Sequence, residues 1–304
     1  STSSPLTVSN KPAWGTCDDA SGNTPCTGHV FTSKVQLANA INSWMVAGAA
    51  AATNTYGDIN TWCTSQITDM SMLMFGHPTF NDDISNWDVS NVTDMSNMFF
   101  SAELFNQDLD TWDTSSVTTM NSMFRHASAF NGKIGAWDVS SVTNMSNMFK
   151  TIESELGAFN QYIGDWDVSN VTDMSYMMFR QSFNQDVGAW DVSSVVNMEY
   201  MFGDSFYFNQ DLSAWNVSNV TNMSWMFSSQ GLMTQYGSMT FDNGQAEGIG
   251  NWNVSNVTNM SGLFYLSSSF NQDLSGWSLH NNVQFSIYSN GATSWDAINH
   301  PSFS

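Results

Sequence analysis

Aspartates recur at regular intervals along the sequence, and carboxylates arranged in rows could bind a metal ion. One row lies in Asn-Gln-Asp-like segments, at Asp83, Asp108, Asp186 and Asp211, and a second follows tryptophan, at Asp88, Asp113 and Asp138. Calcium takes roughly six to eight oxygen ligands, so the rows predict weak calcium binding if these residues stack. Asp exchanges with Asn and Thr at equivalent places. Side-chain hydrogen bonds to turn backbone are therefore the alternative, and they would make the rows structural.

Five asparagines stand in Asn-x-Ser/Thr signals that could carry glycans: Asn91, Asn144, Asn170, Asn219 and Asn256. Such signals are glycosylated on the surface of secreted proteins. The signals recur because a repeated segment contains Asn-Val-Thr and Asn-Met-Ser. A structural role without any glycan is therefore the alternative.

The chain has three cysteines, and two of them lie close together in the sequence. Cys17 and Cys26 flank the Gly/Pro/Asn-containing segment "CDDASGNTPC", which predicts a small disulfide loop. Metal binding is a poorer interpretation, because neither a Cys-x-x-Cys motif nor a nearby histidine pair accompanies them. Cys63 is left over, as a buried free thiol or as a bridge to a partner.

The sequence contains no recognisable catalytic constellation. Its histidines, at positions 29, 77, 126, 280 and 300, are dispersed without metal-ligand spacing. Gly-x-Ser-x-Gly, phosphate-loop and zinc-protease motifs do not occur. We therefore expect no enzyme activity and no required cofactor, with calcium as the one candidate ion.

The charge of the chain is strongly negative, with 27 acids against six cations and a net charge of −21. Such a chain is repelled by nucleic acid and by anionic membranes. No stretch reaches the roughly 20 apolar residues of a spanning helix, so we expect no direct membrane insertion. The Ser/Thr-rich, Lys-poor composition favours a secreted protein in an extracellular or cell-surface setting.

A recurring tryptophan reveals an internal repeat. It stands at positions 62, 87, 112, 137, 166, 190, 215, 252 and 277, mostly 25 residues apart. Methionine and phenylalanine follow each of these tryptophans except the last at similar offsets. A feature repeated many times at one spacing indicates stacking, whereas a catalytic centre needs one asymmetric constellation. The segment "NWDVSNVTDMSNMF" is therefore mostly scaffold.

The period predicts a leucine-rich-repeat-like repeat solenoid of about nine coils. Each coil is expected to hold a short parallel β-strand in "DISNWDV" and a short helical or 3-10 turn in "VTDMSNMF". The residues expected to face inward in one coil are Ile84, Trp87, Val89, Val92, Met95, Met98, Phe99 and Phe105.

The pattern divides the chain into four regions. Residues 1–32 form an extension with the Cys17–Cys26 loop, and residues 33–60 form an N-terminal capping helix and lead-in. The helix is expected from Ser33, as its cap, to Ala52. Residues 61–278 form the repeat, with insertions near 150–158 and 228–248, and residues 279–304 form a C-terminal cap.

The repeated pattern "FNQDLSxWxVSNVTxMSxMF" resembles the BspA-like repeats of bacterial and microbial-eukaryote surface proteins, a divergent leucine-rich-repeat group. The resemblance covers roughly residues 56–277. It implies a secreted or surface-displayed repeat protein used in adhesion or recognition, without catalytic residues.

Two hypotheses of function follow. The chain is either a structural subunit of a surface filament, coat or appendage with a role in adhesion, or a monomeric recognition module that binds a protein or glycan. Self-association or other surface proteins and glycans are the expected partners. The solenoid face and the two insertions are the candidate contact regions of the recognition module.

Overall fold

The computed structural model describes residues 28–151, 156–230, 239–245, 248–279, 283–284 and 302–303. The predicted Cys17–Cys26 loop and most of the expected C-terminal cap lie outside these residues. Within them, no helix is long and apolar enough to cross a membrane.

Two helices precede the repeated segments. α1 spans Lys34–Ala47, and the Ser33 side chain accepts a hydrogen bond from Gln36 N at its start. α2 spans Ala49–Tyr56. Gly48 separates them with φ of 83°, so the helix expected from Ser33 to Ala52 is divided in two.

Three short 3-10 segments complete the helical elements of the described chain. η1 spans Ile59–Thr61, η3 spans Asn243–Gln245 and η4 spans Ile249–Asn251. The strands are β1, Ser278–Leu279, and β2, Ser302–Phe303, which pair in parallel. η4 lies within the repeat, directly before the repeated Trp252.

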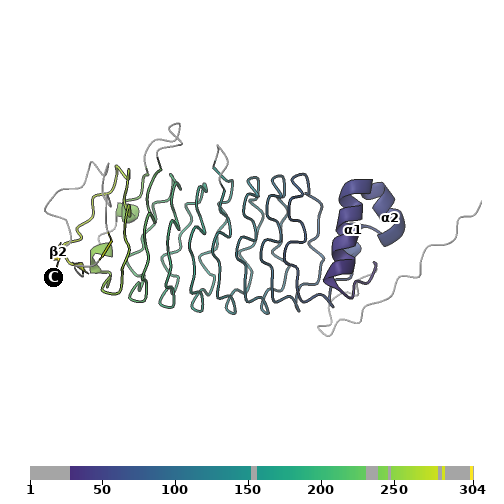
Figure 1. Cartoon of the computed structure of the whole chain (residues 1–304), viewed down its shortest axis with the longest axis horizontal. Coiled ribbons are helices and arrows are strands. Elements are labelled where there is room, and N and C mark those ends of the chain that lie inside the picture. Colours follow the sequence, from purple (N-terminus) through teal and green to yellow (C-terminus); the bar gives the residue numbers. More distant parts are fainter. Residues whose placement is uncertain are drawn as a thin grey trace, which may run out of the picture.

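The prediction of a leucine-rich-repeat-like solenoid with short strands and helical turns is wrong. In the described residues, "DISNWDV" holds turns and no strand, and "VTDMSNMF" holds turns and one isolated bridge at Asp94. Segments of about 25 residues, here called coils, instead lie side by side (Figure 1). Asp94 bridges Asp69 in the preceding coil and Thr119 in the next one.

Left-handed corners explain why "VTDMSNMF" does not form a helix. Asn97 and Ser101 have φ of 56° and 57°, and Ser122 and His126 have φ of 57° and 60°. Most coils therefore turn twice within five residues, whereas the coils of Asn147 and Trp225 have only the first left-handed corner. The spacing of three that predicted a helix comes from tight turns, such as the hydrogen bond from Met98 N to the residue three before it.

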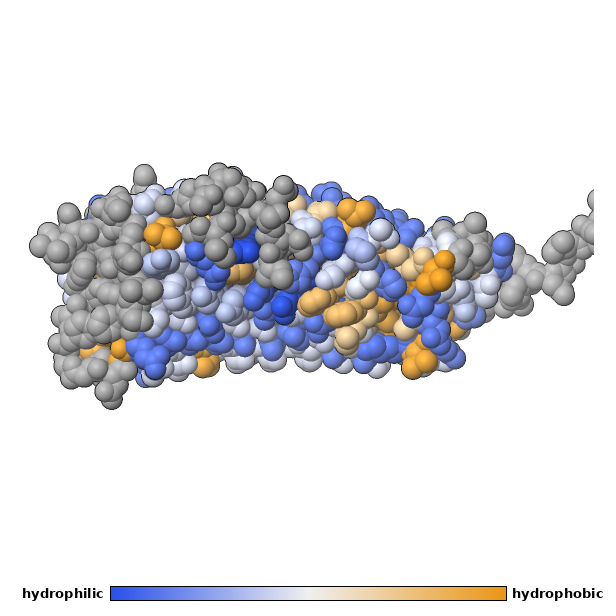
Figure 2. Space-filling model, turned by 45° about the horizontal axis from the view of Figure 1, so that its top comes forward, coloured by the Kyte–Doolittle hydropathy of each residue, from blue (hydrophilic) through white to orange (hydrophobic). Residues whose placement is uncertain are grey.

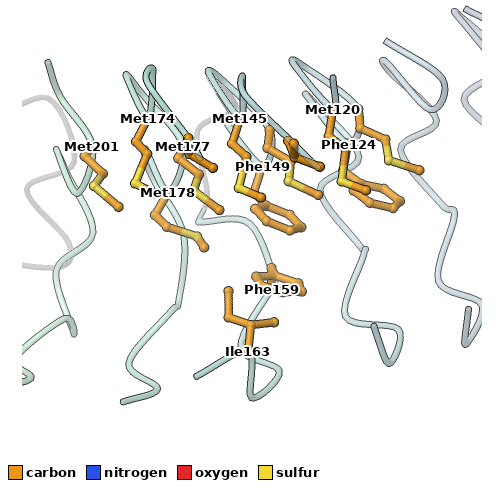
Figure 3. Packing of buried hydrophobic residues seen from close by; sticks show 14 of the residues in the cluster. Met120, Phe124, Met145, Phe149, Phe159, Ile163, Met174, Met177, Met178 and Met201 are labelled. Carbon is orange, nitrogen blue, oxygen red and sulfur yellow. The ribbon is translucent and has the colours of Figure 1, made fainter. Parts of the chain in front are cut away.

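The interior between coils is filled by aligned rows of large apolar side chains. Phe99, Phe124 and Phe149 stack with ring centroids 5.2 and 5.7 Å apart. Figure 3 shows Met145 beside the Phe149 ring and Met174 at the corresponding place in the next coil. All eight residues predicted to face inward in the first complete coil are buried, which confirms that prediction.

The repeated tryptophans join neighbouring coils by hydrogen bonds as well as by packing. Trp137 stacks between Trp112 and Trp166, with centroids 6.2 and 6.3 Å away. Its Nε1–H donates to the backbone oxygen of Leu109 at 2.8 Å. Seven others donate to a backbone oxygen of the preceding segment in the same way. Trp62 donates to Gly57 O, only five residues earlier. Tryptophan recurs because the site needs both a large ring and a donor.

The asparagine of each "FN" segment caps the next coil. Asn106 Oδ1 accepts from Asn131 N at 2.7 Å, and Asn131 Oδ1 accepts from Asn160 N at 2.9 Å. The row continues through Asn184 and Asn209, and Asp242 takes the same role further on. These side chains satisfy backbone N–H groups that no strand partner serves.

Candidate binding edge

The seven aspartates predicted to bind calcium hold the backbone of turns. Asp83, Asp88, Asp113, Asp138, Asp186 and Asp211 each accept from the backbone N–H two residues further on. Asp108 accepts instead from Lys133, through its backbone N–H at 2.9 Å and its Nζ at 3.0 Å. Hydrogen bonds to Ser140 lower the pKa of Asp138, which keeps it ionised as an acceptor. The hydrogen bonds of the structural alternative are therefore present.

No group of three or more His, Cys, Asp or Glu side chains in the described part of the chain is placed to hold a metal ion. The carboxylates of successive coils serve separate turns and do not converge on one point. Calcium binding stays a prediction, and this arrangement gives it no defined site.

Four of the five candidate glycosylation asparagines have a structural task. Asn91, Asn170, Asn219 and Asn256 each donate their side-chain amide to a serine carbonyl in the preceding coil. Asn144 is half-buried, and its Oδ1 accepts from Ser146 N at 2.9 Å. The recurrence of Asn-Val-Thr thus has an explanation within the fold.

Cys63 is disulfide-bonded and buried, so the expectation of a left-over thiol is wrong. Cys17 and Cys26 lie outside the described residues. Because the chain has three cysteines, a disulfide of Cys63 within the chain and a Cys17–Cys26 bond exclude each other.

One edge of the coils departs from the repeat, and we call it the variable edge. It consists of the two left-handed corners and the residue before the second corner. The first corner is occupied in turn by Met72, Asn97, Ser122, Asn147, Tyr176, Tyr200, Trp225 and Gly262. The residue before the second corner is Phe75, Phe100, Arg125, Lys150, Phe179, Gly203, Ser228 or Tyr265. The second-corner position itself is Gly76, Ser101, His126, Thr151, Arg180, Asp204, Ser229 or Leu266, of which Thr151 and Ser229 are not left-handed.

The N-terminal half of the variable edge is apolar and then basic. Phe75, 43% exposed, stacks on Phe100 with centroids 4.7 Å apart. The guanidinium of Arg125 lies 5.2 Å from the centre of the Phe100 ring, and His126 meets the same ring edge-on at 5.4 Å. Figure 2 shows a hydrophobic patch in the half of the molecule nearer the helices, beside strongly hydrophilic residues.

The C-terminal half of the variable edge is aromatic. Lys150 Nζ lies 3.6 Å from the centre of the Tyr176 ring, which is a cation–π contact. Tyr176, Tyr200 and Trp225 then stack at 4.8 and 5.7 Å, and Tyr265 meets Trp225 edge-on at 5.6 Å. The first corner of the coil that follows Trp225 needs a small residue, because a side chain on Gly262 would collide with the Trp225 ring.

Burial and like charge tune the basic groups of this edge. Burial, followed by the charges of Arg125 and Arg180, lowers the pKa of Lys150 to about 8, while Glu199 acts against the shift. Burial, followed by the charges of Arg125 and Lys150, lowers the pKa of His126 to about 4. Lys150 is therefore mostly charged and His126 neutral near neutral pH.

The variable edge was missed by our reading of the sequence. The signal was present, because Tyr176, Tyr200 and Trp225 occupy a place where Asn or Ser stands in three other coils. Alignment of the repeats by position, with attention to the outliers, would have found it. Both predicted insertions also follow this edge closely, after Thr151 and Ser229.

Comparison with known families gave matches along most of the chain. The family described as "Mycoplasma protein of unknown function, DUF285" matches residues 42–156, 153–242 and 236–299. Three successive matches to one description agree with the internal repeat. No curated protein and no solved structure matches the chain significantly.

Proposed function

Because the chain belongs to this DUF285 family, a repeat family found in surface proteins, we propose that it is a non-enzymatic surface protein that acts in adhesion or recognition. The coils form the scaffold, and the variable edge binds the partner. The similarity of the repeated motif to BspA-like repeats supports an extracellular role.

One observation carries this proposal. The repeated residues of the other edges are used to stack coils, as in the hydrogen bonds of Trp137 and Asn131. The variable edge instead changes from apolar to basic to aromatic along the stack. In repeat proteins, stacking residues recur from unit to unit, while a binding surface can vary between units. Tyrosine, tryptophan, phenylalanine and arginine, which occur on this edge, are also the types enriched at interaction sites.

The structural alternative, a subunit of a filament or coat, stays a prediction. The disulfide of Cys63 removes one argument for it, because that cysteine no longer supplies a thiol for bridging to a partner. The size of the native protein in solution separates the two hypotheses.

Light scattering of the native protein, with and without a calcium chelator, is the first test. A monomer whose size is the same with and without the chelator agrees with a recognition module. Large assemblies would overturn the proposal in favour of a filament or coat subunit.

A binding panel of immobilised neutral glycans, acidic glycans and matrix proteins is the second test. We expect the native protein to bind at least one class, and the double variant Tyr176→Ser/Tyr200→Ser to lose that binding. The matched control is Tyr162→Ser/Tyr207→Ser, which removes two tyrosines that are each 50% exposed elsewhere. Equal loss in both variants would show that the variable edge is not the binding site.

A further inference from the structure

Two cations of the variable edge form no salt bridge with the described carboxylates. Salt bridges in the described part of the chain join Lys34 to Asp69, Lys133 to Asp108 and Arg180 to Asp204. Arg125 and Lys150 form none with the acids of these described residues. Both are half-buried and lie in adjacent coils. They form a local cluster of cations on a strongly acidic protein, next to the carboxylate of Glu199, which accepts from the Tyr176 hydroxyl at 3.5 Å.

A buried donor lies beside these cations. His126 is only 6% exposed, and its Nε2 accepts from Arg125 Nε at 3.4 Å. The neutral ring therefore carries its proton on Nδ1. This Nδ1 is buried and has no hydrogen-bond partner among the described residues. A buried unsatisfied donor is rare and often marks the place of an ion or ligand group.

Aromatic rings flank this cluster of cations on both sides along the stack. Phe100 lies under Arg125, and Tyr176 lies under Lys150. Tyr200 and Trp225 extend the aromatic side by two more coils. A small inorganic anion would contact only the charges. A chain of rings with apolar faces and an acidic substituent would contact the charges and the aromatic side chains together.

We propose that Arg125, His126 and Lys150 bind the carboxylate or sulfate group of an acidic glycan. The neighbouring sugar rings then lie along Phe100 and Tyr176. Arginine suits such groups because its donors match two acceptor oxygens at once. Nucleic acid is disfavoured because its dense charge meets the net charge of −21, whereas sparsely charged glycans feel mainly the nearby cations through screening salt. This inference rests on the proposed recognition role of the variable edge.

The test is calorimetric titration of the native protein with four oligomers of similar length. They are a galacturonic acid oligomer, a sulfated dextran oligomer, neutral dextran and polyglutamate. We expect either the galacturonate or the sulfated dextran to bind. The one that binds more tightly shows whether the site recognises a carboxylate or a sulfate. The variant Arg125→Gln/Lys150→Gln should weaken binding about tenfold or more, as expected for the loss of charge-assisted contacts.

The matched control is Lys34→Gln/Lys133→Gln, which changes the net charge equally at two salt bridges away from the site. Binding by this control should stay within about twofold of the native protein, because distant charges act independently. Thermal unfolding checks that both variants fold. Equal weakening in both variants would overturn the site by showing an effect of bulk charge alone.

The other outcomes separate this inference from the proposed function. Polyglutamate binding as tightly as the acidic sugars would overturn the glycan assignment in favour of an acidic peptide. Neutral dextran could bind as tightly as the acidic sugars, with no effect of Arg125→Gln/Lys150→Gln. That result would overturn the anion site and leave the recognition role standing. Binding to none of the four oligomers would overturn the inference, and the broader panel would then decide the recognition role by itself.

Discussion

Substitution of Trp137 by phenylalanine tests whether the repeated tryptophans stabilise the stack through both packing and hydrogen bonding. The Trp137 ring is 3% exposed, and its Nε1 donates to Leu109 O at 2.8 Å. Phenylalanine keeps an aromatic ring but removes the donor and part of the volume. The neighbouring tryptophans are fixed in their own stacks and hydrogen bonds, so they cannot readily fill the space.

The expected loss of stability has two terms. Leu109 O also accepts from Trp112 N at 3.1 Å, so the carbonyl keeps one partner and the lost hydrogen bond costs about 1 kcal/mol. The smaller ring leaves a cavity of about 40 Å³, which adds about 1 kcal/mol at the known cost per unit volume. We therefore expect Trp137→Phe to lower the free energy of unfolding by about 2 kcal/mol.

Urea unfolding followed by far-UV circular dichroism and fluorescence measures this loss. The matched control is Trp225→Phe on the variable edge, where the ring is half-buried and its indole nitrogen makes no hydrogen bond among the described residues. The control should change stability by about 0.5 kcal/mol or less. Both variants lose one tryptophan, so their optical signals are comparable. Equal unfolding midpoints would refute the reasoning.

Three further substitutions test other features of the fold. Asn131→Ala should cost about 1 kcal/mol in urea unfolding by leaving a backbone N–H of the next coil without its acceptor, while Asn131→Asp should cost less because it keeps an oxygen there. Similar losses would contradict the capping role. The pKa of His126 is lowered from 6.5 to about 4, so between these pH values the unfolded chain binds more protons than the folded chain. The free energy of unfolding should therefore fall by about 2–3 kcal/mol as the pH drops through this window. His126→Gln should flatten the pH profile, and an unchanged profile would exclude this group. Gly262→Ala should lower stability by about 2 kcal/mol, because φ is 65° and the added carbon would lie 2.4 Å from the Trp225 ring. Gly76→Ala is the control, because Gly76 has φ of 71° but open space around it, and it should lower stability by about 1 kcal/mol. Equal losses of stability in the two variants would refute the collision with the Trp225 ring.

The core and the stacking direction were accessible from the sequence because they depend on residue type at a fixed period. Trp87, Met95 and Phe99 recur at one spacing, and burial is the common need of such side chains. The hydrogen bonds of the turn aspartates were accessible as an alternative, because Asp exchanges with Asn only where an acceptor oxygen is the requirement.

The local backbone was not accessible in the same way. Asn97, Ser101 and Ser122 have left-handed φ values although none of them is glycine, the usual signal of such a turn. The turns were therefore taken for regular structure. Single-residue bridges replace strands, although corner residues such as Asn97 still donate a backbone hydrogen bond to the next coil. The variable edge escaped notice because a repeat directs attention to what recurs. Arg125 and Lys150 are distant in sequence from the aromatic residues that they meet.

The direction of the hydrogen bonds between coils also determines how the protein responds to force. Bonds such as Met95 N to Thr119 O run from one coil to the next along the stack. A pull on the two ends of the stack loads these bonds in series, so coils peel away one at a time from an end. Each released coil of about 25 residues extends to about 80 Å. The stack therefore lengthens in steps under tension and limits the force that passes from one end of it to the other.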